Sequence, residues 1–192
     1  MNTSRSQSSD GPTTRVQRPG QKRPGIRELG VINNLIVKVG AKVQGTHTLG
    51  VFATIGRAKR LFKAWLVYSA TMMPFGYLSR QETELVILRV AFHKGSAYEE
   101  AHHRAIGASE GLSSEEIDAM FEEDHGQLGR RGAMLDVADQ IVLTGVVDDE
   151  TWAKLAALLS DKECVALVML VTNYSGLATA LSVLGTPVDE RR

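Results

Sequence analysis

The sequence contains a single cysteine, Cys164, among its 192 residues. One thiol excludes an internal disulfide bond and any metal site built on several thiolates, and such scarcity is typical of the reducing cytoplasm. Long hydrophobic runs are also missing, because the longest, residues 165–171, is far shorter than the roughly 18–20 residues that a membrane-spanning helix needs. Since no signal-peptide core is apparent either, we expect a cytoplasmic protein without a membrane segment.

An excess of either charge is lacking as well. Lysine and arginine together number 22, as do aspartate and glutamate, so the chain has no general electrostatic attraction to nucleic acid or to anionic membranes. The hydrophobic fraction of 43% is ordinary for a globular chain. These values favour one domain with its own core, and a small-molecule substrate or further protein chains as partners.

Aliphatic side chains are scarce in residues 1–25, which are rich in Ser, Thr, Gly, Pro, Gln and Arg. Such a segment cannot bury enough apolar surface to offset the entropy that is lost when it is ordered. Its basic residues are opposed only by Asp10, which could support weak contact with an anionic surface. We predict a flexible basic tail over residues 1–25 and a helical domain over residues 26–192.

Beyond the tail, apolar residues recur at helical spacing and show little of the alternation that is typical of strands. The sequence therefore predicts an all-α fold. The final helix is apolar around much of its circumference over residues 165–171, which indicates burial on several sides, in part by a second subunit. The predicted helices span residues 31–44, 50–72, 80–94, 97–110, 114–124, 131–144, 149–159 and 161–184.

Helix boundaries are marked by two kinds of cap. Three capping boxes, each a serine followed three residues later by a glutamate, predict helix starts because both side chains can satisfy free backbone N–H groups. Glycines follow several helical patterns at positions where left-handed caps would end the helices. The capping boxes begin at Ser79, Ser113 and Ser160, and the glycines are Gly95, Gly111, Gly145 and Gly185.

Glu84 lies in the middle of the apolar face of the helix predicted over residues 80–94. On a wheel of about 100° per residue, aliphatic residues flank it on both sides, whereas Glu82 and Arg89 fall on the opposite, polar face. A buried carboxylate needs a polar partner, or else its pKa rises until the group is neutral. We favour a partner in a pocket; the alternative is that Glu84 reaches solvent at the edge of the core.

The next predicted helix supplies candidate partners in the stretch GSAYEEAHH, residues 95–103. Glu99 and His103 are four residues apart, close enough for the carboxylate to orient the imidazole. A helical hairpin can place Glu84 opposite the first turns of this helix, and an acid facing a histidine is a general acid–base arrangement. The alternative is that one of His102 and His103 is hydrogen-bonded in the core and the other is solvated.

The spacing of these residues resembles a known active-site signature. Eleven residues separate Glu84 from Ser96, two separate Ser96 from Glu99, and three separate Glu99 from His103. In alkyl hydroperoxidase D and its carboxymuconolactone decarboxylase-like relatives, the pattern is Glu, eleven residues, Cys-x-x-Cys, three residues, His. The chain thus resembles a cysteine-free variant of this superfamily.

The resemblance extends beyond the signature. The portion YE-x-x-x-H, from Tyr98 to His103, is similar to a branch in which YEW-x-x-H is common, although Glu100 replaces the tryptophan. Weaker similarity covers roughly residues 30 to 185. The resemblance implies an all-helical, alkyl hydroperoxidase D-like bundle that assembles as a dimer, trimer or hexamer, with its site in a cleft between helices near a subunit interface.

Ser96 and Glu99 occupy the positions of the two redox cysteines, and Cys164 lies far away in an apolar helix. Without a pair of thiols, the thiol peroxidase chemistry that the family implies is not expected, because a serine cannot form a sulfenic acid and a buried thiol lacks a resolving partner.

The part of the signature that remains handles protons. Glu84 and His103 are predicted to act as an acid–base pair, with Glu99 orienting the imidazole and Tyr98 as a donor to a developing oxyanion. This set suits decarboxylation, lactone opening or isomerisation of a small carbonyl- or carboxylate-containing substrate, with no cofactor and no metal. Further candidates for binding the substrate are His102, Ser96, Asn173 and Tyr174.

Three other functions stay open. The chain could be a non-catalytic helical oligomer that binds a small apolar ligand, since a fold does not guarantee an activity. It could be an antioxidant peroxidase of the alkyl hydroperoxidase type. It could also hold a metal, because E-x-x-H pairs such as those of di-iron bundles occur at Glu99–His102 and at Glu122–His125, although such short matches arise easily by chance.

Overall fold

The computed structural model describes residues 16–192, and within that range it is helical, with no strand. This confirms the predicted all-α fold class. A short 3-10 turn, η1 (Pro19–Gln21), precedes the helices. The helices are α1 (Ile26–Leu29), α2 (Val31–Val43), α3 (Gly50–Ile55), α4 (Lys59–Ala70), α5 (Arg80–Lys94), α6 (Ala97–Ser109), α7 (Ser114–Ala119), α8 (Gly129–Thr144), α9 (Asp149–Ala156) and α10 (Asp161–Leu184).

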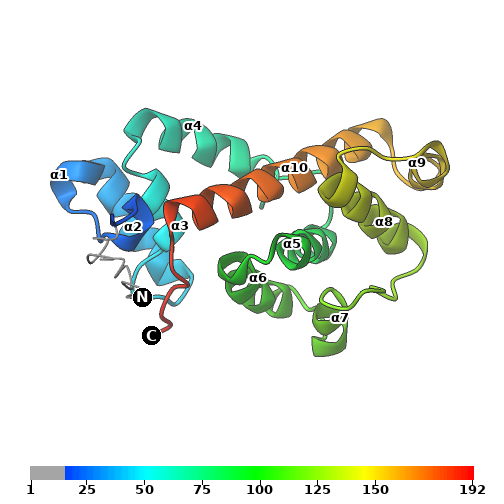
Figure 1. The fold of residues 1–192 in the computed structure, drawn as a ribbon, viewed down its shortest axis with the longest axis horizontal. Coiled ribbons are helices and arrows are strands. Elements are labelled where there is room, and N and C mark those ends of the chain that lie inside the picture. Colours follow the sequence, from blue (N-terminus) through cyan, green and yellow to red (C-terminus); the bar gives the residue numbers. More distant parts are fainter. Residues whose placement is uncertain (1–15) are drawn as a thin grey trace, which may run out of the picture.

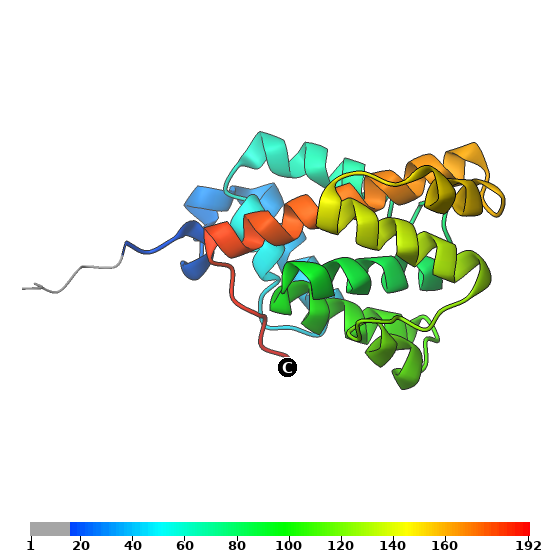
Figure 2. The ribbon, with the colours of Figure 1, turned by 45° about the vertical axis from the view of Figure 1, so that its right-hand side comes forward.

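The long helix α10 runs along the molecule, with α8 and α9 near its first turns and α1 to α4 around its last turns (Figures 1 and 2). The main core lies where α5 packs against α6, α8 and α10. The aliphatic side chains of α5, including Leu85 and Leu88, are almost completely buried there. Each such side chain contributes about 1.5–3 kcal/mol of hydrophobic stabilisation, so this contact anchors the fold.

The predicted caps that position α5 are present. The Ser79 hydroxyl accepts a hydrogen bond from the Glu82 N–H at 3.2 Å, and the Glu82 carboxylate accepts one from the Ser79 N–H at 3.0 Å. Gly95 ends the helix with φ = 57°, a left-handed conformation that a side chain would disfavour. The turn at Gly95 joins α5 to α6 as the expected helical hairpin.

The prediction of a single helix over residues 50–72 is wrong, because the helix is interrupted between α3 and α4. The Gly56 carbonyl accepts a hydrogen bond from the buried Asn33 side chain at 3.1 Å, which a continuing helix would require for itself. The break lets α4 turn back, so that Phe62 and Trp65 meet Phe52 of α3 in an aromatic cluster. The hydrogen bond from Asn33 joins residues more than twenty positions apart, so local periodicity in the sequence cannot predict the break at Gly56.

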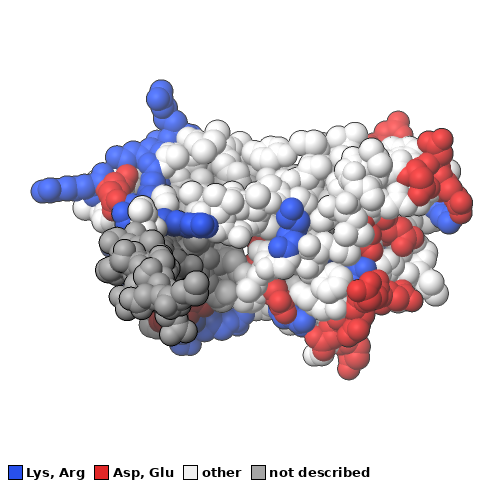
Figure 3. Space-filling view, viewed as in Figure 1, with Lys and Arg blue, Asp and Glu red and all other residues white. Residues whose placement is uncertain are grey.

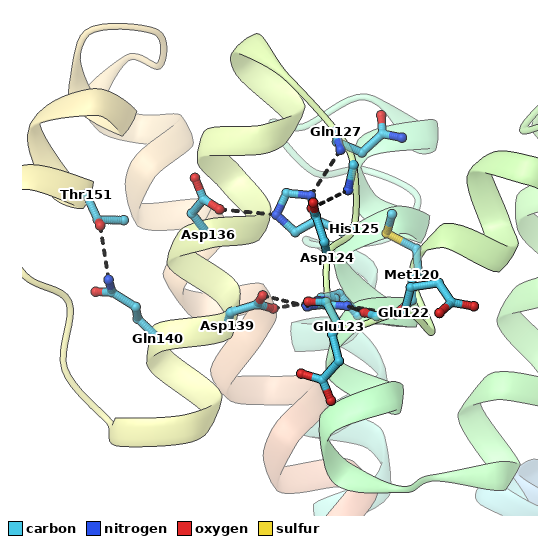
Figure 4. A network of polar contacts seen from close by, with 12 residues as sticks. Met120, Glu122, Glu123, Asp124, His125, Gln127, Asp136, Asp139, Gln140 and Thr151 are labelled. Carbon is cyan, nitrogen blue, oxygen red and sulfur yellow. Dashed lines mark hydrogen bonds and ion pairs between the residues drawn. The ribbon is translucent and has the colours of Figure 1, made fainter.

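A second difference concerns Arg89, which the helical wheel places on a polar face. Its side chain is 1% exposed and forms two bonds with the Asp139 carboxylate, at 2.7 and 2.8 Å. Its other donors go to the carbonyl oxygens of Met120, Glu122 and Glu123, which are labelled together with Asp139 in Figure 4. These carbonyl oxygens accept hydrogen bonds from the guanidinium instead of from backbone N–H groups of a continuing helix. Helix α7 therefore ends at Ala119 and not near residue 124, as the sequence predicted.

Residues 1–15 of the predicted flexible tail lie outside the described residues. The described part of that segment contacts α10, where the Arg18 guanidinium donates to the carbonyls of Ser182 and Val183. At the other end of the chain, the segment after α10 crosses the loop before α3. There His47 donates its N–H to the carbonyl of Glu190 at 3.1 Å. Both segments therefore lie against the same end of the bundle.

Charged side chains are unevenly distributed over the surface in Figure 3. Lysine and arginine gather at the end that holds α1 and α2, and aspartate and glutamate at the end that holds α7 and α9, while the surface between them over α4 and α10 has few charges. Val67 of α4 and Val165 of α10 are among the exposed apolar residues. By length and composition alone α10 could cross a membrane, and in the described part of the chain one side of it packs against α5 and α8.

Candidate active site

Glu84 and His103 face each other across the α5–α6 hairpin. The Oε2 atom of Glu84 lies 2.7 Å from Nδ1 of His103, and Glu84 is fully buried. The predicted juxtaposition of these two residues is therefore observed, and the alternative in which Glu84 reaches solvent does not occur. Since a carboxylate only accepts hydrogen bonds, Nδ1 of the imidazole carries the proton in this pair and Nε2 is left for another partner.

The second oxygen of Glu84 has a cationic neighbour. Nη2 of Arg80, one helical turn earlier, lies 3.3 Å from Oε1, as an ion pair that is not aligned as a hydrogen bond. The same guanidinium binds Glu110 at 3.2 Å, which holds it in place. Burying a carboxylate is costly without compensation, and here an imidazole N–H and a guanidinium together provide it.

A cavity of about 280 Å³ lies beside this pair, between α3, α4, α6 and α10. Its walls are mainly apolar, with Trp65 and Leu177 among the larger contributors. His103 lines the cavity whereas Glu84 stands behind it, so the imidazole is the member of the pair that a ligand would meet. An apolar cavity with a few polar groups is typical of a small-molecule site.

Glu99 also lines the cavity, and its carboxyl group is unusual. The residue is 2% exposed, and within residues 16–192 neither of its oxygens has a hydrogen-bond partner. Burial raises the pKa of Glu99 to about 8. The nearby Ser96 hydroxyl opposes this shift without completing a hydrogen bond. The carboxyl group is therefore largely protonated at neutral pH, and it can donate a hydrogen bond.

The position of Glu99 does not fit the role that the sequence predicts for it. It does not orient the imidazole, because Nδ1 of His103 is already bonded to Glu84, which performs that task from the neighbouring helix. Ser96, a predicted binding residue, is the N-cap of α6 and is not among the cavity-lining residues that the structure describes. The position of the first redox cysteine therefore lies at the start of the helix, whereas that of the second lies in the wall of the cavity.

Tyr98 and His102 line the cavity and share a partner that sequence analysis missed. Asp189 Oδ2 accepts a hydrogen bond from the Tyr98 hydroxyl at 2.7 Å and lies 3.1 Å from His102 Nε2. Burial, and next the charge of Asp189, raise the pKa of Tyr98 above its usual value. Because the hydroxyl donates to Asp189 and accepts from the Val51 N–H, it is not free to stabilise an oxyanion as predicted. Asp189 follows the last helix, where no periodic pattern could have identified it.

Asn173 and Tyr174 of α10, two of the residues predicted to bind the substrate, line the cavity. The Tyr174 ring meets the His103 ring edge to face, with centroids 5.3 Å apart. Burial, and next the nearby Glu84, raise the pKa of Tyr174, so that its hydroxyl stays neutral. The Asn173 amide nitrogen is buried with no hydrogen-bond partner in the described part of the chain, and it is therefore available to a ligand.

The two E-x-x-H pairs do not form a metal centre. No group of three or more His, Cys, Asp or Glu side chains within residues 16–192 is placed to hold a metal ion. His102 pairs with Asp189, and His125 lies 3.2 Å from the Asp136 carboxylate. Both histidines are thus engaged by single aspartates.

The protein is all-α and has the alkyl hydroperoxidase D-like fold, with a helical hairpin, a long last helix and a cavity beside them. A Ralstonia eutropha protein described as an alkylhydroperoxidase AhpD core has a TM-score of 0.77 and 17% identity, with 88% of this chain and 91% of that chain covered. An uncharacterized peroxidase-related protein from a Silicibacter species has a TM-score of 0.77 and 13% identity, with 94% and 96% covered. A protein of unknown function from Agrobacterium tumefaciens has a TM-score of 0.60 and 22% identity, with 66% and 89% covered.

Sequence comparison matches part of the chain to a protein family. Residues 59–125 match the model of the carboxymuconolactone decarboxylase family, and they include Glu84, Glu99 and His103. No curated protein matches the chain significantly. The resemblance to the carboxymuconolactone decarboxylase and alkyl hydroperoxidase D-like superfamily is therefore confirmed.

Proposed function

We propose that the protein is an acid–base enzyme that acts on a small carbonyl- or carboxylate-containing organic molecule, by isomerisation, lactone opening or decarboxylation. The observation that carries the proposal is the 2.7 Å contact between Glu84 and His103 at the wall of a mainly apolar cavity. A histidine oriented by a buried carboxylate is a general base whose protonated form the carboxylate stabilises. The raised pKa of Glu99 adds a proton donor to the same cavity.

An isomerisation illustrates how these groups would act. Nε2 of His103 removes a proton from the carbon beside the carbonyl group, and the electron pair of that C–H bond forms a carbon–carbon double bond. The carbonyl electron pair moves onto oxygen, which the Glu99 carboxyl group stabilises by donating a hydrogen bond. In a substrate with a carbon–carbon double bond one bond further from the carbonyl group, the negative charge extends over that double bond. The carbonyl group then re-forms and the double bond moves next to it, while the imidazolium, stabilised by Glu84, returns the proton to the far carbon of the original double bond, so that no oxidant or cofactor is consumed.

A peroxidase reaction by thiol chemistry has less support. Cys164 is buried, and burial together with the neighbouring Asp161 and Glu163 raises the pKa of its thiol. A raised pKa lowers the fraction of reactive thiolate. Since Ser96 and Glu99 replace the paired cysteines of the family signature, no second thiol exists to resolve an oxidised Cys164.

The proposal is tested by proton exchange and turnover with a panel of small ketones, lactones and β-keto acids, followed by NMR in deuterated buffer. We expect His103→Ala and Glu84→Gln to lower kcat by about 10²–10⁴-fold, the usual contribution of a general base. The exposed His47 and the partly exposed Glu100, which do not line the cavity, provide matched controls as His47→Ala and Glu100→Gln. Full activity in His103→Ala would refute the mechanism.

A second candidate is a non-catalytic protein that binds a small ligand, and the mainly apolar walls of the cavity favour it. Ligand binding without turnover or proton exchange in the wild-type protein would support this candidate over the enzyme.

We also propose that the chain forms a homo-oligomer through the weakly charged surface over α4 and α10, where Val67 and Val165 are exposed. An apolar surface of this kind is costly to leave in water. Light scattering after size-exclusion chromatography tests the proposal, with Val67→Asp and Val165→Asp expected to lower the mass. A monomeric wild-type protein would contradict it. The cytoplasmic location stays a prediction.

A further inference from the structure

Three side chains from three helices place unsatisfied polar atoms around the cavity. They are both carboxyl oxygens of Glu99 in α6, the amide nitrogen of Asn173 in α10 and the hydroxyl of Ser69 in α4. In the described part of the chain these atoms are buried and have no hydrogen-bond partner. Leaving a buried polar atom unpaired costs about 1–3 kcal/mol, so a ligand that pairs with several of them at once would recover part of that energy.

The cavity does not offer a positive charge to a ligand. Among its described lining residues there is no lysine or arginine. His102 is paired with Asp189, and Nδ1 of His103 is bonded to Glu84, so both histidines already face carboxylates. Because an ionised ligand loses its hydration on entering an apolar cavity, a second carboxylate here would be strongly disfavoured without a cation.

The protonation of Glu99 adds to this selectivity. Burial raises its pKa to about 8, so that below this pH its carboxyl group is a neutral hydrogen-bond donor. The other titratable side chains that line the cavity are Tyr98, His102 and His103 from α6 and Tyr174 from α10. Glu84 and Arg80 of α5 form an ion pair behind the cavity wall. Arg80, the one permanent cation of this set, is held by Glu84 and Glu110, so it does not offset the burial of Glu99.

We propose that the cavity selects uncharged carbonyl compounds, such as small ketones, esters or lactones with an apolar body, over carboxylates. The carbonyl oxygen accepts hydrogen bonds from the Glu99 carboxyl group and from the Asn173 amide, while the apolar body lies against Trp65 and Leu177. A volume of 280 Å³ equals roughly nine water molecules of the liquid, so the ligand has on the order of ten non-hydrogen atoms. The inference deepens the proposed function by naming its substrate class, but it concerns binding alone.

The test compares three probes of nearly equal size by titration calorimetry or ligand-observed NMR. Acetophenone carries a neutral carbonyl group, benzoate carries a carboxylate, and ethylbenzene carries neither. At pH 7 we expect acetophenone to bind at least tenfold more tightly than benzoate or ethylbenzene. Its affinity should fall about tenfold between pH 7 and pH 9, because Glu99 loses its proton and its donor over that range.

Variants assign the effect to particular atoms. Glu99→Gln keeps a neutral donor, so acetophenone should still bind but without the fall above pH 7. Asn173→Leu should weaken acetophenone and leave ethylbenzene unchanged, and Glu100→Gln, on the same helix but not lining the cavity, should change neither. Benzoate binding as tightly as acetophenone would overturn the proposal. So would ethylbenzene matching acetophenone, or acetophenone failing to bind.

The outcomes separate this inference from the proposed enzymatic function. Selective binding of acetophenone without proton exchange or turnover of any panel compound would support the binding inference and contradict the proposed enzymatic function. Turnover of carboxylates combined with preferred binding of benzoate would support the proposed enzymatic function and contradict the binding inference.

Discussion

The Tyr98 hydroxyl lies 2.7 Å from Asp189 Oδ2, although the two residues are 91 positions apart in the sequence. The same carboxylate accepts the N–H of Gly50 with both of its oxygens, at 2.9 and 3.0 Å, and it also contacts His102. One side chain thus connects the segment after α10 to α3 and to α6. Two walls of the cavity are held by a residue that does not line it.

We predict that Asp189→Asn loosens this junction. An amide can accept only at its oxygen, so at least one of the donors from Gly50, Tyr98 and His102 loses its partner. Unpairing a buried donor costs about 1–3 kcal/mol, which urea unfolding should report as a lower midpoint. Glu190→Gln, the neighbouring exposed carboxylate, is the control and should change stability little. Equal midpoints for Asp189→Asn and the wild type would show that the junction does not support the fold.

The proton of the His103 imidazole is predicted to reside on Nδ1, because that nitrogen lies 2.7 Å from the Glu84 carboxylate. Long-range ¹H–¹⁵N NMR of the ring nitrogens measures this directly. Glu84→Leu removes the acceptor, and the ring should then populate the Nε2-protonated form. Glu100→Gln serves as the control. An Nε2-protonated ring in the wild type would contradict the proposed base.

Glu99 should make the protein less stable as the pH rises through the range between its unfolded and folded pKa values. The folded-state pKa of about 8 exceeds the ordinary value of 4.5, so the folded chain retains a proton that the unfolded chain releases. The contribution to stability is complete below about pH 4.5 and is lost progressively up to about pH 8, by an amount on the order of a few kcal/mol. Chemical unfolding at several pH values measures it.

Glu99→Gln is the matched variant for this measurement, because the amide has nearly the same shape and does not titrate. Its stability should decline less than that of the wild type between pH 5 and pH 8, and at pH 8 the variant should be the more stable of the two. Parallel curves for both proteins would show that Glu99 does not carry a raised pKa.

Arg89→Met should destabilise the protein strongly, since it leaves a partly buried carboxylate short of donors and three carbonyl oxygens without their partner. Removing one partner of a buried ion pair costs about 3–5 kcal/mol. Urea unfolding measures this loss, and hydrogen exchange should show faster opening of residues 120–124. Arg60→Met, on the exposed surface of α4, is the control. A loss as small as that of the control would contradict a structural role for Arg89.

The sequence was sufficient to predict the central pair because the signal is local. Glu84 interrupts an apolar face, and a fixed interval separates it from His103, so a hairpin of two capped helices brings them together. Helical periodicity alone does not decide between His102 and His103, and it is His103 that contacts Glu84, as the resemblance to the family implied. The interval along the chain was the better guide to this partner.

What could not be predicted depends on contacts between distant segments. The wheel treats α5 as a surface helix with one polar side, but α5 is surrounded by α6, α8 and α10, so Arg89 is buried as well. Asp189 and the break at Gly56 are likewise set by partners far away in the sequence. The donor role proposed for Glu99 could not be predicted either, because the burial that raises its pKa exists only once the helices around the cavity have assembled.

The walls of the cavity come from two parts of the chain. The segment that matches the family, residues 59–125, supplies Glu84, Glu99 and His103, whereas α3 and α10 supply opposing walls from outside it. The three proposed reactive groups thus lie in one stretch of the chain, and part of the cavity wall lies outside that stretch. Substitutions in α3 and α10 can therefore change the shape of the cavity without altering Glu84, Glu99 or His103.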